Sequence, residues 1–103
     1  MIDVKTTFEK HDDEYLQFDK VESPRHPRAD VCAFLLLHDL APCDPFKGKT
    51  QVRDMVSCAE HAEIWLDTDI DVLAQNATEA DIVTLARCGV RYDASVDRLA
   101  MYV

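Results

Sequence analysis

The chain has 103 residues, of which 48% are hydrophobic and 30% charged, with two glycines and four prolines. This composition predicts one folded domain and excludes a disordered chain, which would carry fewer apolar residues and more glycine and proline. Twenty acidic residues against eleven basic ones give a formal net charge of −9, which argues against direct nucleic-acid binding, since phosphate contacts need clustered lysine and arginine.

No pattern in the sequence indicates export or membrane insertion. No apolar run approaches the roughly 18 residues that a transmembrane helix needs, and the first residues lack the basic start and apolar stretch of a signal peptide. We therefore expect a cytoplasmic protein with no membrane partner, in a compartment where thiols stay reduced. Free thiols that are buried or half-buried are expected at Cys32, Cys43, Cys58 and Cys88.

The first predicted element is a strand over residues 14–21. Leu16 and Phe18 alternate with polar residues, and this period is typical of a half-buried strand. A turn before it would allow pairing with residues 4–8. Two prolines then break the chain, because a proline disfavours helical backbone in the residue before it.

Residues 29–40 form the most apolar stretch and lie between Pro27 and Pro42. Length and the leucine and alanine content favour a helix, and a helix that is apolar all round must be buried on nearly every side. A buried central strand is the alternative, because an uninterrupted apolar run has no period. Residues 41–54, with two prolines and a glycine, are predicted to be a loop.

Residues 63–67 contain strong strand formers and predict a short strand. Asp69 or Asp71 is suited to cap a short helix that runs through Ala74, because an aspartate oxygen accepts the free N–H groups of a first helical turn. A change from strand to helix is therefore expected near residue 69.

A second, better capped helix is predicted to begin at Thr78. Asp81 stands where a capping box has its acidic residue, and Gly89 is placed to end the helix. The apolar stripe of this helix comprises Ile82, Leu85 and Ala86. Two strands follow, at residues 90–92 and 99–103. Together the elements predict a small α+β domain over residues 1–103, with about four antiparallel strands and two or three helices on one face.

Two histidines and two cysteines form the candidate zinc site, which comprises His38, Cys43, Cys58 and His61. Zinc accepts two thiolates and two imidazoles in a tetrahedral arrangement, and it can stabilise a small loop-rich domain. The spacing matches no standard ligand pattern closely. We therefore expect no cofactor, with a zinc-stabilised module as the alternative.

A small hydrolase is a further alternative. Cys58 and His61 would be close enough to form a nucleophilic pair if their segment were helical, and the carboxylates Glu60 and Glu63 could serve in acid–base chemistry. A nucleophilic site also needs an orienting third group and an oxyanion site. A chain with two glycines has few backbone-lined pockets, so a non-enzymatic protein is expected.

The charge distribution between residues 54 and 81 is the strongest functional signal. This stretch contains eight acidic residues and no lysine or arginine. If the even-numbered residues 62–66 face the core, the odd-numbered residues 61–67 share the other face of the strand. The single tryptophan, Trp65, then lies among carboxylates.

A tryptophan rimmed by carboxylates is typical of a binding hot spot for a basic partner. The alternative is that Trp65 is buried beneath a helix and the acidic residues keep the protein soluble. The candidate partner-binding residues are Glu60, Glu63, Trp65, Asp67, Asp69 and Asp71.

The sequence therefore predicts an acidic, non-enzymatic interaction protein, such as an inhibitor or accessory factor, that binds a basic protein partner. If this partner itself binds nucleic acid, the carboxylates would occupy its phosphate-binding sites. Small phage and mobile-element proteins block host nucleases or defence complexes in this way, which is an analogy of charge and size alone. The partner-binding site is not expected to bind nucleic acid directly.

Overall fold

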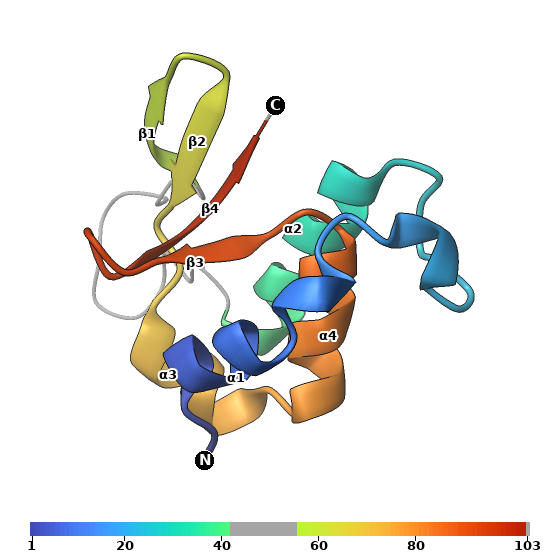
Figure 1. Cartoon of the computed structure of the whole chain (residues 1–103), viewed down its shortest axis with the longest axis horizontal. Helices are drawn as coiled ribbons and strands as arrows, with labels where there is room; N and C mark the ends of the chain where they lie inside the picture. Colours follow the sequence, from blue (N-terminus) through green and yellow to red (C-terminus); the bar gives the residue numbers. More distant parts are fainter. Residues whose placement is uncertain (42–55, 103) are drawn as a thin grey trace.

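Helices pack against one side of a four-stranded antiparallel sheet in the computed structural model, which describes residues 1–41 and 56–102 (Figure 1). The helices are α1 (Val4–Lys10), α2 (Ala29–Leu40), α3 (Ile70–Asn76) and α4 (Glu79–Arg87). The strands are β1 (Val56–Glu60), β2 (Glu63–Leu66), β3 (Arg91–Asp93) and β4 (Arg98–Tyr102), in the order β1-β2-β4-β3. The predicted α+β class is confirmed, although the described residues form four α-helices where two or three were predicted.

The predicted helix starts in the second half of the chain are confirmed. Asp69 caps α3, and its Oδ1 accepts from the backbone N–H groups of Asp71 at 3.0 Å and Val72 at 3.2 Å. Thr78 and Asp81 form the capping box of α4, each side chain accepting from the backbone N–H of the other residue. These bonds satisfy N–H groups that have no partner within the helix.

The predicted strands at residues 14–21 and 4–8 are wrong. Residues 4–10 form α1, which begins after Asp3, and Val4 and Phe8, one turn apart, are both buried. Residues 14–21 contain short 3₁₀ turns, and Leu16 is exposed with a φ of +63°. An alternation of two apolar residues is too short to distinguish a strand from such turns. In residues 4–10, the spacing of four between Val4 and Phe8 favours a helix with one buried face.

The helix predicted over residues 29–40 is confirmed as α2, but the prediction that it is buried on nearly every side is wrong. Cys32, Ala33 and Leu37 are buried on one face, whereas Val31 and Leu35 are half-buried. A small domain has too few neighbouring elements to cover a helix on every side. The predicted loop, apart from Ala41, lies outside the described residues.

Strand β1 was not predicted, because residues 56–60 contain no aromatic residue and a single β-branched one. The strand forms by pairing with β2 through the tight turn at His61 and Ala62, whose φ values of 50° and 64° are both left-handed. Two residues with positive φ are typical of the turn that joins a two-strand hairpin. Non-local pairing, and not local propensity, therefore creates this strand.

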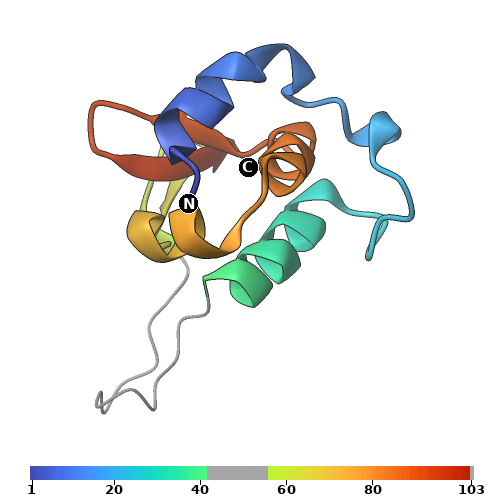
Figure 2. The same ribbon diagram turned by 90° about the horizontal axis from the view of Figure 1, so that it is seen from below.

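The core lies between the sheet and the helices, and all four helices contribute to it (Figure 2). The largest fully buried side chains are Leu37, Leu66, Leu73, Ile82, Leu85, Val90 and Leu99. The predicted apolar stripe of α4 is buried as expected. Cys32 and Cys88 are buried free thiols, as predicted, whereas Cys43 and the side chain of Cys58 lie outside the described part. Among the described residues, no helix has the length and apolar character needed to cross a membrane.

Candidate functional site

Strand β2 carries the centre of the predicted binding face. Ile64 and Leu66 are buried, and Glu63 and Trp65 are half-buried on the opposite face of the sheet. The alternation predicted for these four residues is therefore confirmed. It does not extend to His61 and the exposed Ala62, which belong to the β1–β2 turn.

Trp65 lies on a sheet face whose centre is the small residue Ala100. The strand register places Trp65 on one side of Ala100 and Arg91 on the other. Ala100 is fully buried. Because its side chain is a single methyl group, side chains from β2 and β3 can bind one another across β4.

Two polar contacts cross β4 in this way. The indole N–H of Trp65 donates to Asp93 Oδ2 at 3.0 Å. In the other direction, the Arg91 guanidinium pairs with the carboxylate of Glu63 and lies 4.9 Å from the centre of the Tyr102 ring. Glu63 and Trp65 thus take part in the internal contacts of the sheet, which the sequence did not indicate.

The partner of the indole, Asp93, is held by further hydrogen bonds in the β3–β4 turn. Its Oδ1 accepts from the backbone N–H of Ser95 at 3.0 Å and from the Ser95 hydroxyl at 2.6 Å. The bond from the Ser95 hydroxyl, then the one from Trp65 and the one from the Ser95 backbone, hold the pKa of Asp93 below its ordinary value. The carboxylate therefore stays ionised under all but acidic conditions.

This bond predicts an acid titration of the fluorescence of Trp65. Protonation of Asp93 removes the charged acceptor, so the emission should change with a midpoint below the ordinary aspartate pKa of 3.8. Because the folded-state pKa is lowered, the stabilising contribution is present above that ordinary value and is lost as the pH falls through the folded-state pKa. Asp93→Asn should abolish the step, and circular dichroism should show that the chain is still folded at its midpoint. The same titration in Asp93→Asn would contradict the assignment.

Three of the predicted carboxylates, all aspartates, line a hollow of about 400 Å³ at the far end of β2. Residues 67–71 and residues 96–98 line it, so it lies between the β2–α3 connection and the β3–β4 turn. We call it the acidic hollow. Among the described residues, its charged side chains are Asp67, Asp69, Asp71, Asp97 and Arg98. Four carboxylates against one guanidinium leave an excess of three negative charges.

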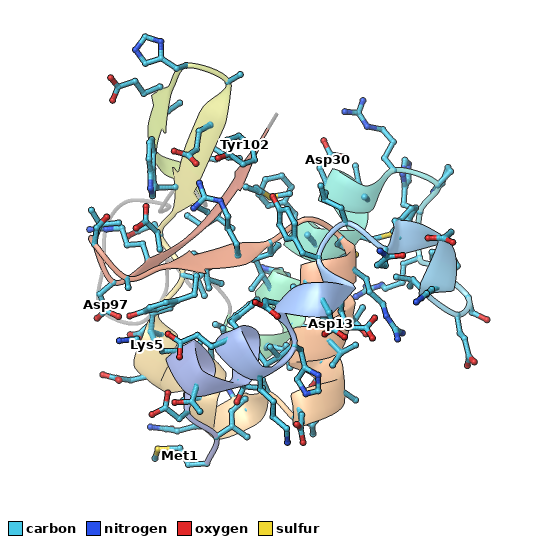
Figure 3. The ribbon with its side chains drawn as sticks, in the orientation of Figure 1. Met1, Lys5, Asp13, Asp30, Asp97 and Tyr102 are labelled. Atoms are coloured by element: carbon cyan, nitrogen blue, oxygen red, sulfur yellow. The ribbon has the colours of Figure 1, made fainter. Side chains whose placement is uncertain are left out.

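The carboxylates of the acidic hollow have different surroundings. Asp67 forms an ion pair with Arg98 at 3.4 Å, and Asp69 caps α3. Asp71 is exposed in the first turn of that helix. Asp97, in the β3–β4 turn (Figure 3), accepts from the Tyr92 hydroxyl, and this bond is the main reason why the pKa of Tyr92 is raised to about 12. Asp97 was not predicted, because only the β3–β4 pairing places it here.

The six predicted binding residues therefore do not form one patch. Glu60 and Glu63 lie beside the β1–β2 turn, and the three aspartates lie at the opposite end of β2, with Trp65 between the two groups (Figure 1). Glu60 is exposed and lies 3.4 Å from His61. The acidic hollow holds the larger group of the predicted carboxylates.

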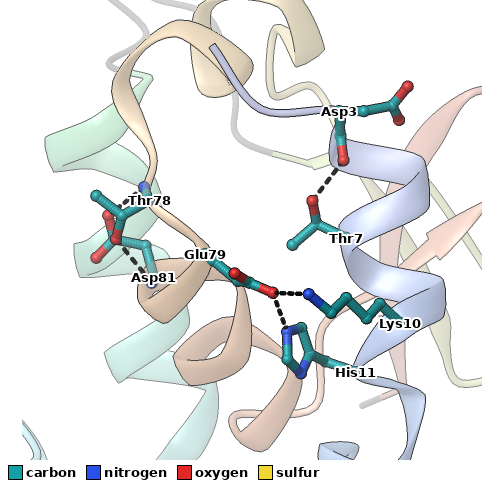
Figure 4. A network of polar contacts seen from close by, with 7 residues as sticks. All are labelled: Asp3, Thr7, Lys10, His11, Thr78, Glu79 and Asp81. Atoms are coloured by element: carbon teal, nitrogen blue, oxygen red, sulfur yellow. Dashed lines mark hydrogen bonds and ion pairs between the residues drawn. The ribbon is translucent and has the colours of Figure 1, made fainter.

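One carboxylate of the acidic stretch joins two helices instead of facing solvent alone. Glu79 of α4 binds Lys10 at 2.8 Å and His11 at 2.7 Å, both at the end of α1 (Figure 4). Lys10 first, and then His11, lower the pKa of Glu79. Its position in the sequence suggested an acidic surface, and its contacts show an additional structural role.

The residues of the candidate zinc site are only partly described. His38 is exposed near the end of α2 and His61 lies in the β1–β2 turn, and these elements lie in separate parts of the molecule (Figure 1). Cys43 and the Cys58 side chain lie outside the described part. Among the residues that are described, no group of three or more histidine, cysteine, aspartate or glutamate residues could hold a metal ion.

The geometry considered for a Cys58–His61 nucleophilic pair does not apply. It required a helix, whereas Cys58 belongs to strand β1 and His61 to the turn that follows.

Three comparisons of the chain with known proteins, using family models, curated proteins and solved structures, found no match.

Proposed function

We propose that the chain is a non-enzymatic, cytoplasmic interaction protein that binds a basic protein partner through the acidic hollow. The excess of three negative charges among Asp67, Asp69, Asp71, Asp97 and Arg98 is the observation that carries this proposal. Such a surface attracts a basic partner over a distance and orients it before contact.

Lysine and arginine side chains of the partner would enter the hollow in this proposal. Asp71 and Asp97 are exposed, and neither forms an ion pair with a described residue. If the partner binds nucleic acid, these carboxylates would compete for its phosphate-binding residues, and the chain would act as an inhibitor or accessory factor. The net charge of −9 is unfavourable for contact with nucleic-acid phosphates, so we propose that the chain binds the protein partner and not the nucleic acid itself.

The double substitution Asp71→Asn, Asp97→Asn tests the proposal. Asparagine has nearly the same shape as aspartate, tolerates the left-handed backbone of Asp97 and can still accept from Tyr92. Binding of a labelled arginine-rich peptide, measured by fluorescence anisotropy, should weaken roughly fivefold, because two attractive charges are lost. Binding by the unmodified chain should weaken as salt rises, since charges are screened beyond about 8–10 Å at physiological ionic strength.

The matched control is Asp19→Asn, Glu22→Gln, which changes the net charge equally at two exposed positions away from the hollow. This control should retain most of the affinity. An equal loss in both double variants, or binding that does not depend on salt, would contradict a localised acidic site.

A further inference from the structure

Two hollows beside the sheet share one wall, Tyr15, and are separate from the acidic hollow. The first has a volume of about 320 Å³ and the second about 410 Å³. We call them the paired hollows. Apolar and aromatic side chains of the first include Phe8, Ala86, Val90 and Tyr92, and those of the second include Leu16, Ala29, Met101 and Tyr102.

The second hollow is bordered by large apolar side chains that the fold leaves in solvent. Leu16 is 65% exposed and Tyr102 is 61% exposed. Exposed apolar side chains that gather beside a hollow are typical of a surface that contacts another protein.

The backbone holds Leu16 in this position despite an unfavourable conformation. Its φ of +63° is left-handed, which costs a leucine free energy that glycine or asparagine would largely avoid. The Leu16 N–H donates to the carbonyl of Ala86 at 3.0 Å. The side chain lies against Gly89, where an added Cβ would come within 3.1 Å of it. A leucine that is both strained and exposed contributes little to the fold, so binding is the better explanation of its presence.

The exposed carboxylates beside the first hollow give it a negative charge. Glu9 and Asp12 line this hollow, are exposed, and have no ion-pair partner among the described residues. The two arginines that line the paired hollows are already neutralised, Arg91 by Glu63 and Arg28 by Asp30. An occupant with positive charge next to an apolar group matches this arrangement.

We propose that the paired hollows bind a basic segment of a protein partner that inserts two apolar side chains, one on each side of Tyr15. Lysine or arginine residues next to the first apolar side chain meet Glu9 and Asp12. This inference rests on the proposed function, a basic partner, and adds the apolar contacts that such a partner needs. Buried apolar side chains supply most of the affinity at protein interfaces, whereas surrounding charges mainly set the association rate.

Three synthetic peptides of equal length test the inference with the full chain labelled with ¹⁵N. The first carries two leucines among lysines, the second has serine in place of the leucines, and the third has glutamate in place of the lysines. The first peptide should bind saturably and shift the amide signals of Phe8, Tyr15, Val90 and Tyr102. The second and third should bind at least about tenfold more weakly, because each lacks one of the two contributions.

Two variants separate binding from folding. Leu16→Asn removes the exposed leucine and suits the left-handed backbone, so thermal stability should be kept or raised while affinity for the first peptide falls about tenfold. Glu9→Lys should weaken binding several-fold, whereas Glu22→Lys, an equal change at an exposed position outside both hollows, should not.

The outcomes distinguish this inference from the proposed function. Unchanged affinity in Leu16→Asn, or no binding of the first peptide, would overturn the inference. Amide shifts confined to the acidic hollow, with affinity lost in Asp71→Asn, Asp97→Asn, would overturn it while supporting the proposed function. Equal binding of the lysine and glutamate peptides at the paired hollows would overturn the basic character of the segment that binds there, and with it this inference, whereas the proposed function would still be decided by the Asp71→Asn, Asp97→Asn variant.

Discussion

Replacing Trp65 with alanine is expected to lower the free energy of unfolding by about 2–4 kcal/mol. A fully buried large aromatic costs about 3–5 kcal/mol when truncated, and Trp65 is half-buried beside Ala100. The variant also leaves Asp93 without the indole N–H that donates to it at 3.0 Å. Urea unfolding followed by far-ultraviolet circular dichroism measures the loss without relying on the tryptophan itself.

Trp65→Phe is the matched variant, because it keeps an aromatic ring on the sheet while it removes the N–H donor and part of the ring surface. It should cost about 1–2 kcal/mol, which is the usual contribution of one hydrogen bond together with a small loss of packing. If Trp65→Ala unfolds at the same urea concentration as the unmodified chain, the indole has no structural role. That result would support the hypothesis that Trp65 is a binding hot spot for a partner. The half-buried position, with its bond to Asp93, makes the structural contribution the expected result.

Reversing the charge of Glu63 is the second large effect that we expect. Glu63→Lys places an ammonium group against the Arg91 guanidinium, where the two side chains are only 17% and 28% exposed. Breaking a buried ion pair costs about 3–5 kcal/mol, and this partly exposed pair should cost about 2–3 kcal/mol. Asp67 also forms an ion pair with an arginine, Arg98, so reversing either carboxylate is expected to lower stability.

The exchange Glu63→Lys, Arg91→Glu isolates the pair. It restores opposite charges at the same two positions and should recover a measurable part of the lost stability, although lysine cannot reproduce the geometry of arginine. Glu60→Lys, at an exposed position of the neighbouring strand β1, is the control and should change stability by less than about 0.5 kcal/mol. No recovery in the exchange variant would show that the Arg91–Glu63 contact is not the source of the loss.

These ion pairs change which carboxylates are best suited to bind a partner. Glu63 and Asp67 are engaged by Arg91 and Arg98, so their negative charge is partly neutralised within the fold. Asp71 and Asp97 are exposed and form no ion pair with a described residue. A binding experiment is therefore more informative when it alters these two aspartates, because the sheet does not depend on their charge.

The features that could be predicted from the sequence are those that depend on neighbours within a few residues. Asp69 and the Thr78–Asp81 pair each satisfy N–H groups two or three residues away, so their caps are visible in the sequence. Gly89 ends α4 because its φ of 95° suits a residue without a side chain. The alternation of β2 likewise depends only on the period of an extended strand, and it correctly separated Leu66 from Trp65.

Only the tertiary structure decided which of these residues meet. β4 lies between β2 and β3, so Trp65 reaches Asp93 and Glu63 reaches Arg91 across Ala100, over 28 residues in each case. No local pattern encodes a contact of that separation, because it depends on strand order and register. The same pairing brings Asp97 to the acidic hollow, and pairing with β2 makes a strand of residues 56–60. Local propensity thus determined most helix ends and strand β2. Long-range pairing determined which carboxylates form ion pairs within the fold and which are exposed and available to a partner.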